Sequence, residues 1–373
     1  MRIAVNTRFL LKGRLEGIGW FTDQVLQRLV AAHPEHEFVF FFDRPFDKAF
    51  LYGPNVTPVV CQPPARHALL WYWWFEWSLP AALKKAQADV FLSPDGFCSL
   101  RTKVPTVMVT HDVAHLHFPQ EVPLHGRVFY NYYVPRYLQR SERVVTVSNF
   151  TKRDILKHYP VEADKVKVAC NGCREVFQPL APAEQQKVRQ QYAAGQAYFF
   201  YLGAVHPRKN VHRLIEAFDR FKQRTQSPVK LLIGGRFGWQ TGVVKAAYDA
   251  AQFQKDITFL GYIPDEDLPR LTAAALALTY VSLFEGFGVP ILEAMHCDVP
   301  VITSTVSSMP EVAGEAGYLV DPTIVDQIAI AMQELWEQPV LRQKLITAGQ
   351  QQRQKFSWEK ATEVIDLALQ EVS

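Results

Sequence analysis

Two glutamates eight residues apart flank a glycine-rich turn in the segment Glu285-Gly-Phe-Gly-Val-Pro-Ile-Leu-Glu293. Because proline suits a first helical turn, we expect Glu285 in a loop and Glu293 about one turn inside a helix that starts near Pro290. The N–H groups at a helix start favour an anion or a polyhydroxyl ligand. The pair could be ordinary solvated charges. Alternatively, the two carboxylates could bind two hydroxylated parts of one ligand, such as the sugar and the ribose of a nucleotide sugar.

A basic turn lies upstream of this pair. An apolar run at 198–202 predicts a strand, residues 211–221 predict an amphipathic helix, and Gly203-Ala-Val-His-Pro-Arg-Lys209 connects them. A strand, a glycine turn and a helix start commonly cradle phosphate groups. Arg208 and Lys209 could therefore neutralise a diphosphate leaving group. A basic surface turn without a ligand is the alternative.

A second glycine turn, Gly17-Ile-Gly19, lies between an expected strand at 3–7 and an expected helix at 20–30. Glycines at such a place let the backbone approach a phosphate at the helix start. The turn is not a dinucleotide-binding fingerprint, because Thr22 stands where its third glycine is required. On its own it is a weak indication of phosphate binding.

The expected strand at 106–110 ends in His111-Asp112, and two further histidines follow at His115 and His117. Three histidines so close together could bind a metal ion. The zinc-binding helix motif, however, requires its histidines on one helical face. Because His111 ends a strand and a proline follows shortly, we expect no catalytic metal here, and we expect His115 and His117 to be packing or loop residues.

Together these segments resemble the retaining glycosyltransferases of family 4, whose signature includes two glutamates eight residues apart. The resemblance continues through residues 145–154 and 307–314 and covers essentially the whole chain. It implies an α/β fold of the GT-B type, with two doubly wound Rossmann-like domains that face each other across a cleft. The first domain would present an acceptor hydroxyl, and the second would bind a nucleoside diphosphate sugar.

The resemblance also implies a role for each motif. Glu293 would accept the ribose hydroxyls, and Glu285 would hold the transferred sugar. Lys209 and Arg208 would stabilise the departing diphosphate, although many relatives have an arginine where this chain has Ala204. The other expected contacts are Gly17 and Gly19 to the diphosphate, the backbone of Phe287 and Gly288 to the sugar, His111 to the donor sugar, Asp112 as a further carboxylate at the reacting centre, and the backbone at Tyr262 and Ile263 to the base.

Retention of configuration could arise from a double displacement with a carboxylate nucleophile. The family instead implies front-face attack, in which the donor phosphate helps to remove the acceptor proton and neither Glu285 nor Glu293 is the nucleophile. Protein cations and backbone amides are available for the diphosphate. We therefore expect no metal and no other cofactor beside the nucleotide sugar.

The elements that must position these residues alternate between apolar strands and helices, which predicts parallel sheets. A chain of 373 residues exceeds the size of most single cores. We expect an acceptor-binding domain at 1–176, a nucleotide-sugar-binding domain at 177–355, and a closing helix at 356–373 that returns to the first domain. The proline-rich stretch around 177–182 marks the break.

Charge and cysteine content indicate which classes of binding partner and which cell compartment are expected. Residues 1–175 hold 22 Lys and Arg against 16 Asp and Glu, and five cysteines are scattered along the chain. The basic first half suits an anionic surface, whereas the lack of a basic-aromatic repeat disfavours nucleic acid. The cysteines, and the lack of a signal peptide or of an apolar run long enough to span a bilayer, fit the cytoplasm.

The aromatic stretch 71–77 could either pack into the first domain or contact the cytoplasmic face of an anionic membrane. We therefore expect a bacterial hexosyltransferase that extends a glycan or lipid-linked glycan in lipopolysaccharide, O-antigen or exopolysaccharide assembly. Mannose from GDP-mannose is the first expectation, from its frequency in the family. The alternatives are another GT-B enzyme, such as a phosphorylase or a nucleotide-sugar epimerase, or a non-catalytic sugar-nucleotide-binding module.

Overall fold

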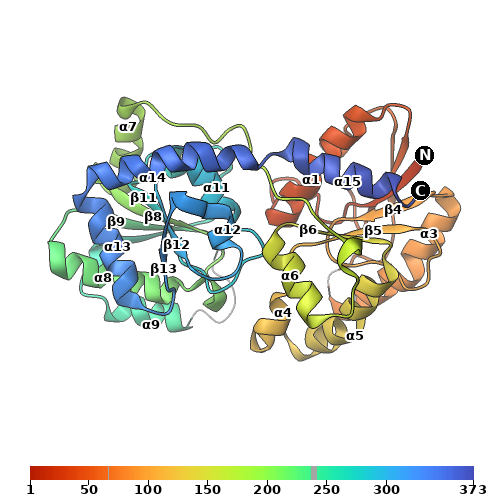
Figure 1. The fold of residues 1–373 in the computed structure, drawn as a ribbon, viewed down its shortest axis with the longest axis horizontal. Helices are drawn as coiled ribbons and strands as arrows, with labels where there is room; N and C mark the ends of the chain where they lie inside the picture. The colour runs from red at the N-terminus through yellow and green to blue at the C-terminus, as the bar shows by residue number, and fades with distance from the viewer. Residues whose placement is uncertain (66, 237–241) are drawn as a thin grey trace. The chain divides into compact units, whose positions relative to one another are not determined.

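The computed structural model describes residues 1–65, 67–236 and 242–373 of the chain (Figure 1). The chain divides into two compact units, and each is built on one parallel sheet with helices on both faces. Unit 1 contains Met1–Asn171 and Ser357–Ser373, and unit 2 contains Gly172–Phe356. The expected fold of two doubly wound α/β domains is confirmed.

Unit 1 has a seven-stranded sheet in the order β3-β2-β1-β4-β5-β6-β7. Its central strands are buried on both faces, which explains their unbroken apolar runs. The strands are β1 Arg2–Asn6, β2 Glu37–Phe42, β3 Val56–Val60, β4 Val90–Ser93, β5 Thr106–Thr110, β6 Arg143–Thr146 and β7 Val166–Val168. The helices are α1 Gly17–Ala32, α2 Ala68–Trp73, α3 Leu79–Ala86, α4 Ala114–His117, α5 Leu124–Arg140, α6 Asn149–His158 and α15 Trp358–Gln370, with short turns η1 Lys48–Phe50, η2 Trp74–Ser78, η3 Pro119–Glu121 and η4 Ala163–Lys165.

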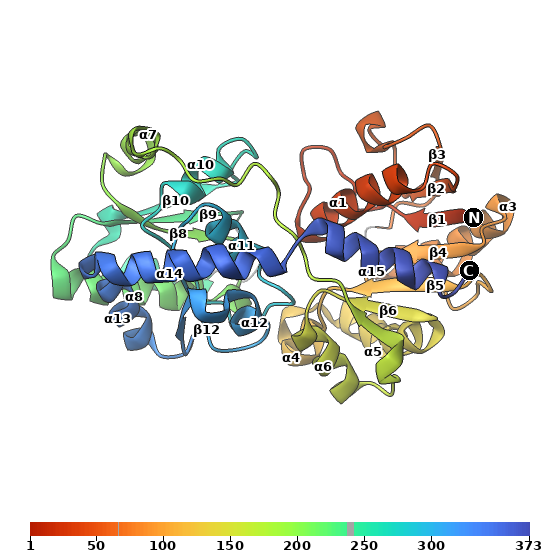
Figure 2. The ribbon, with the colours of Figure 1, turned by 45° about the horizontal axis from the view of Figure 1, so that its top comes forward.

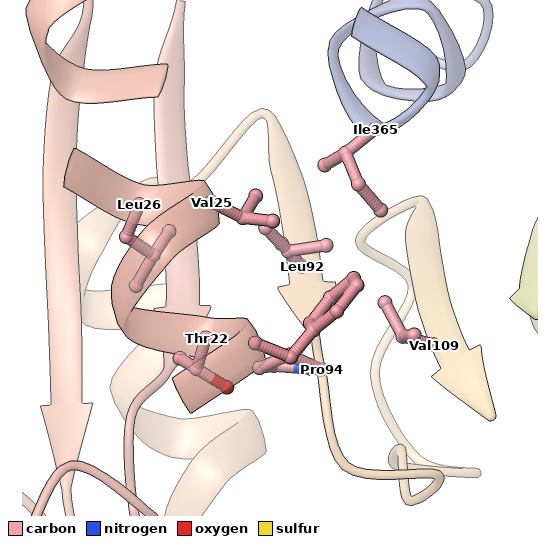
Figure 3. A pocket seen from close by; sticks show the side chains of 8 residues that line it. Thr22, Val25, Leu26, Leu92, Pro94, Val109 and Ile365 are labelled. Atoms are coloured by element: carbon pink, nitrogen blue, oxygen red, sulfur yellow. The ribbon is translucent and has the colours of Figure 1, made fainter. Parts of the chain in front are cut away.

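The last helix, α15, belongs to unit 1 and packs beside α1 (Figure 2). Ser357 caps its start by accepting a hydrogen bond from the Lys360 amide, and the Trp358 ring meets Phe21 of α1 edge-on at 6.0 Å. A small apolar hollow remains where α15 faces α1, β4 and β5 (Figure 3), but it is too small for a water molecule. It is therefore a packing defect and not a ligand site.

The aromatic stretch 71–77 continues from α2 through η2, a single π-helical turn, into α3. The extra residue of the π turn changes which side chains face inward. Trp74 and Phe75 are fully buried, whereas Trp73 and Trp77 are exposed and stack on each other at 6.1 Å. Part of the stretch is therefore core, and part lies on the surface.

Unit 2 has a six-stranded parallel sheet in the order β10-β9-β8-β11-β12-β13. Its strands are β8 Tyr198–Leu202, β9 Lys230–Gly234, β10 Ile257–Gly261, β11 Ala277–Tyr280, β12 Val301–Ser304 and β13 Gly317–Val320. Its helices are α7 Pro182–Ala193, α8 Val211–Thr225, α9 Gly242–Ala250, α10 Leu268–Ala273, α11 Val289–His296, α12 Met309–Ala313, α13 Val325–Glu337 and α14 Pro339–Gln352, with short turns η5 Pro207–Lys209, η6 Gln254–Asp256, η7 Gly314–Ala316 and η8 Arg353–Lys355.

The strands expected at 3–7, 106–110 and 198–202 are present within two residues of their expected ends, but β3 and β13 were not anticipated. Both are edge strands and are only partly buried, so neither has the unbroken apolar pattern of a central strand. Pro58 further obscures β3, because proline is tolerated in a sheet mainly at an edge. All five cysteines are free thiols. Among the described residues, no helix is both long and apolar enough to cross a bilayer.

Candidate functional site

The polar motifs of unit 2 meet at the point where the strand order reverses. Strand β8 lies beside both β9 and β11, and the chain crosses from one side of the sheet to the other between these neighbours. Ligands of open α/β sheets bind beyond the carboxyl ends of the strands at such a switch point. The basic turn follows β8, and the loop that carries Glu285 follows β11. The fold therefore brings together two segments that are about 75 residues apart.

Lys209 and Glu285 form the centre of this site. Lys209 Nζ donates to Glu285 Oε1 at 2.5 Å and to the Tyr280 hydroxyl at 3.0 Å. The same hydroxyl donates to Glu285 Oε1 at 2.9 Å. Tyr280 ends β11, and its ring stacks on Tyr201 of β8. Lys209, Glu285 and Tyr280 thus form one hydrogen-bonded triangle.

Arg208 connects the two loops through their backbones. Its Nη1 donates to the Phe284 carbonyl at 2.6 Å and lies 3.8 Å from Glu285 Oε2, while its carbonyl accepts from the Leu283 amide at 2.8 Å. Burial alone would raise the pKa of Glu285, but Lys209 and Arg208 overcome this effect and hold the pKa below its ordinary value. The cluster therefore contains two cations and one ionised carboxylate, and its net charge is positive.

Two serines hold the loop between β11 and α11. The Glu285 amide donates to Ser307 Oγ at 3.1 Å, and Ser308 Oγ donates to the carbonyls of Glu285 and Phe287 at 2.9 and 2.8 Å. The Phe287 ring packs against Phe356 at 5.5 Å, so its side chain is occupied by packing. Gly288 precedes α11 with a φ of +101°, a conformation that favours glycine.

Asn210, the last residue of the basic turn, has a structural role that the sequence did not reveal. It is fully buried with a φ of +61°, and its side-chain amide donates to the carbonyls of Val281 and Pro322 at 3.0 and 2.6 Å. It therefore fastens the turn to the loop after β11 and holds Lys209 within reach of Glu285.

Glu293 is the fifth residue of α11, about one turn inside the helix as expected. It is buried, and burial raises its pKa to about 7, although Arg174 opposes the shift with Nη2 at 3.6 Å from Glu293 Oε1. Arg174 was not anticipated from the sequence, because it lies in an irregular segment far from the other motifs. A carboxyl with this pKa is poised to ionise near neutral pH when a hydrogen-bond donor approaches.

Arg174 also contacts Asp265-Glu266-Asp267, an acidic D-x-D run of the kind that can bind a metal ion, which the expectation of a metal-free reaction did not take into account. Asp265 Oδ1 lies 3.5 Å from Arg174 Nη1, and Asp267 Oδ1 accepts from Arg270 at 3.3 Å. The run follows β10, which is separated from β11 by two strands, β9 and β8. Each of its two aspartates is thus beside an arginine, an arrangement that disfavours a cation.

Glycines close the turns after β8, β9 and β10. A Cβ on Gly235 would lie 1.9 Å from the Gly203 carbonyl oxygen, so these turns approach each other as no other residue type allows. Tyr262 and Ile263 follow β10. Ile263 is buried against Gly234, whereas 60% of Tyr262 is exposed. Gly203 was expected in such a turn from the sequence, whereas Gly235 was not.

In unit 1, His111 and Asp112 follow β5. Burial lowers the pKa of His111, which favours its neutral form; its Nε2 lies 2.8 Å from the Pro94 carbonyl and its ring meets Phe21 edge-on at 5.1 Å. Asp112 Oδ1 accepts from the Ala114 amide at 2.9 Å, which closes the turn that leads into α4. The structure thus fixes both side chains at the carboxyl edge of the sheet.

The two glycines at the start of α1 have different surroundings. A Cβ on Gly19 would lie 2.9 Å from the Phe9 carbonyl oxygen, whereas a Cβ on Gly17 would meet no atom of residues 1–65, 67–236 and 242–373 within 4 Å. Close packing against Phe9 therefore explains why position 19 is a glycine. The backbone at Gly17 is not packed in this way.

The three histidines considered as metal ligands have separate partners. His111 contacts Pro94, His115 Nε2 lies 3.0 Å from the Tyr159 hydroxyl, and His117 Nε2 lies 2.8 Å from Asp154 Oδ2. Their ring nitrogens are thus drawn to different partners.

A buried ion pair at the switch point of unit 1 was missed from the sequence. Arg8 follows β1 and pairs with Asp95, which follows the neighbouring strand β4, and Asn6 donates to the same carboxylate at 2.7 Å. The Arg8 guanidinium carbon lies 4.6 to 5.1 Å from three phenylalanine ring centroids. The sequence did contain one indication of this pair, because Arg8 and Asp95 are polar residues that directly follow two apolar strands.

Solved structures share this fold over the whole chain. Anabaena Alr3699/HepE, solved in complex with UDP and glucose, matches with a TM-score of 0.78 at 19% identity and covers 100% of both chains. WaaG, a glycosyltransferase involved in lipopolysaccharide biosynthesis, matches with a TM-score of 0.77 at 16% identity over 100% of this chain and 99% of its own. The two units therefore have the GT-B fold.

Comparison of the sequence with protein families and with related proteins also indicates a glycosyltransferase. The family described as Glycosyltransferase Family 4 matches residues 15–174, and Glycosyl transferases group 1 matches residues 183–352. O-antigen chain mannosyltransferase B of Escherichia coli is 33% identical over 282 residues, which are 75% of this chain and 74% of that protein. O-antigen chain mannosyltransferase RfbU of Salmonella typhimurium is 26% identical over 72% of this chain and 71% of its own. The chain belongs to the group 1, family 4 glycosyltransferases, and it is an enzyme of that class.

Proposed function

We propose that this glycosyltransferase moves a hexose, with retention and without a metal ion, from a nucleoside diphosphate sugar to a hydroxyl of a glycan. Mannose from GDP-mannose is the proposed donor, in lipopolysaccharide or O-antigen assembly. The main support for the proposal is the positively charged Lys209–Arg208–Glu285 cluster at the switch point of unit 2. It combines two cations, which can bind a diphosphate, with a carboxylate that can accept hydrogen bonds from sugar hydroxyls. The names of the two mannosyltransferase relatives support the sugar and the pathway.

On the donor side, Lys209 and Arg208 would bind the diphosphate. Preorganised donors of this kind contribute roughly 2.7–4 kcal/mol each to transition-state stabilisation. Glu285 would accept hydrogen bonds from the transferred sugar, and Glu293 from the ribose. The backbone at Phe287 and Gly288 would support the sugar. Tyr262 and Ile263 would contact the base.

On the acceptor side, unit 1 offers a matching arrangement. His111 and Asp112 lie at the carboxyl edge of its sheet, and the Arg8–Asp95 pair lies at its switch point. Because Nε2–H of neutral His111 is donated to the Pro94 carbonyl, its Nδ1 is left to accept a hydrogen bond from a sugar hydroxyl. We place the acceptor glycan at this edge. In front-face attack, the donor phosphate would remove the proton of the acceptor hydroxyl.

We further propose a peripheral contact of unit 1 with the cytoplasmic face of an anionic membrane. Two stripes of exposed large apolar residues support it, one on α2 and η2 and one on α5, and these helices touch. Arg101 lies over Trp77 and Arg136 over Tyr132, which places cations beside exposed rings as a headgroup interface requires. The exposed residues are Leu69, Trp73, Trp77, Leu124, Val128 and Tyr132.

The membrane contact predicts sedimentation with phosphatidylglycerol vesicles that weakens as salt is raised. Replacing Trp73 and Trp77 together with serine should abolish it, while replacing Val340 of unit 2, an apolar residue that is even more exposed, should not. Full activity on a soluble acceptor, without any vesicle binding at low salt, would rule the contact out.

Calorimetry with a panel of nucleotide sugars tests the donor. GDP-mannose should bind more tightly than UDP-glucose, and GDP should compete with it. Tighter binding of UDP-glucose would indicate that the transferred sugar is a hexose other than mannose. No binding of any nucleotide sugar would overturn the proposed function itself.

A further inference from the structure

Helices α4 and α6 of unit 1 hold three side chains that converge outside the proposed catalytic residues. His117 Nε2 lies 2.8 Å from Asp154 Oδ2, and His158 Nε2 lies 3.4 Å from Asp154 Oδ1. The ligand atoms of all three residues lie within 4.8 Å of one another. One carboxylate therefore lies between two imidazoles.

This arrangement has the dimensions of a transition-metal site. Zinc binds imidazole nitrogens and carboxylate oxygens at about 2.0–2.2 Å, so tetrahedral ligand atoms are roughly 3.3 Å apart. The two nitrogen–oxygen distances, 2.8 and 3.4 Å, bracket this value. We propose that His117, Asp154 and His158 bind a zinc ion or a similar divalent transition metal, with water in the open position.

The three side chains are already oriented toward one another without a bound metal. Asp154 and His158 are four residues apart on α6, so they lie on one face of the helix. The rings of His117 and His158 meet edge-on at 5.5 Å, which leaves both Nε2 atoms directed at the same carboxylate. The Asp154 side chain is only 7% exposed. Its charge is therefore little screened by solvent.

A second histidine cluster in unit 1, formed by His33, Glu35 and His36, is less suited to a metal. Both nitrogens of His33 already have carboxylate partners, Glu35 at 2.9 Å and Asp366 at 3.0 Å. His36 Nδ1 lies 3.3 Å from the terminal ammonium group, whose positive charge opposes a cation. The two imidazoles also stack face to face at 4.8 Å. This cluster provides the natural comparison for the experiment.

The metal would join α4 to α6 and would have a structural consequence. Helix α4 starts at Ala114, two residues after Asp112, and its His115 lies 3.0 Å from the hydroxyl of Tyr159, the residue that follows α6. A metal at its last residue would restrain the segment that follows β5. The site goes beyond the proposed sugar transfer and takes no part in its chemistry.

The test uses the full chain with its purification tag removed and any bound metal stripped by a chelator. Calorimetric titration with Zn²⁺ should give one ion per chain, and Co²⁺ should produce the visible absorption of a tetrahedral complex. The same ion should raise the thermal unfolding midpoint. Binding of neither ion at tens of micromolar would overturn the proposal.

Variants locate the ion. His117→Ala and His158→Ala should each weaken binding by at least tenfold, since both histidines are partly exposed and their loss leaves the core intact. His125→Ala, at another exposed histidine, and His33→Ala should leave binding unchanged. Binding that survives in both site variants, or that disappears in His33→Ala, would place the metal elsewhere. Sugar transfer by the metal-free protein is measured separately, so failure of one proposal does not imply failure of the other.

Discussion

Lys209 Nζ donates to Glu285 Oε1 at 2.5 Å, although the two residues lie on different loops after neighbouring strands. The lysine proposed to bind the diphosphate thus neutralises the carboxylate proposed to hold the sugar. A donor that binds here must share Lys209 with Glu285 and can use the carboxylate only in its ionised form. The pKa of Glu285, held low by the two cations, keeps that form present across the physiological range.

Glu285→Gln should separate turnover from nucleotide affinity. The amide keeps a hydrogen-bond acceptor but loses the charge that pairs with Lys209, so the lysine becomes more available to the diphosphate. We expect the turnover number to fall at least tenfold while the affinity for the nucleoside diphosphate is unchanged or rises. Steady-state kinetics and calorimetry on one preparation provide both values. A parallel loss of nucleotide affinity would indicate that Glu285 acts on the nucleotide instead.

Lys209→Met should weaken donor binding, because methionine keeps most of the side chain's length without its charge. Loss of a charge-assisted hydrogen bond costs about 1.5–3 kcal/mol, or roughly 10- to 150-fold in affinity. Lys187→Met, at an exposed lysine on α7 of the same unit, is the matched control. Equal donor affinities in the two variants would remove Lys209 from the diphosphate site.

Donor affinity should rise with pH through about 7 because of Glu293. Its raised pKa means that the folded protein favours the protonated form, so this contribution to stability is present at pH 4.5 and is lost as pH rises through about 7. Ribose hydroxyls bind the ionised carboxylate, so donor binding should follow the opposite trend. Calorimetry between pH 6 and pH 8 measures this slope, and Glu293→Gln should flatten it. An unchanged slope in the variant would assign the titration to another group.

Gly235→Ala should destabilise unit 2, because the new Cβ would meet the Gly203 carbonyl oxygen at 1.9 Å and the φ of +129° is unfavourable for alanine. Backbone strain of this kind costs about 1–3 kcal/mol. Gly242→Ala, at the start of α9 with no atom of the described residues within 4 Å of the new Cβ, is the control. Chemical denaturation compares the two variants, and equal stabilities would show that the turns can separate at little cost.

The sequence predicted the parts of the site that depend on regular elements. The basic turn and the Glu285–Glu293 segment each follow an apolar strand, so alternation of strands and helices was enough to place them at a sheet edge. Arg174 and Asn210 could not be assigned in this way, because their partners are distant in sequence and only the folded chain brings them together. The same limit applies to the Arg8–Asp95 pair, whose two residues are 87 positions apart.

The aromatic stretch 71–77 shows a different limit. Its composition suits both a core and a membrane interface, and the side chains are divided between these environments by one π-helical turn. A single inserted residue in a helix leaves no clear signal in hydrophobic periodicity. Burial of Trp74 and exposure of Trp73 therefore had to come from the structure.

Retaining, metal-independent transfer is tested most directly by a transfer assay with ¹³C-labelled GDP-mannose and a mannose-terminated lipid-linked acceptor in the presence of EDTA. We expect release of GDP and a product whose new linkage has the α configuration of the donor by NMR, with at least tenfold slower transfer in Lys209→Met. A β-linked product, or transfer that requires Mg²⁺ or Mn²⁺ to be restored, would contradict retaining, metal-independent transfer.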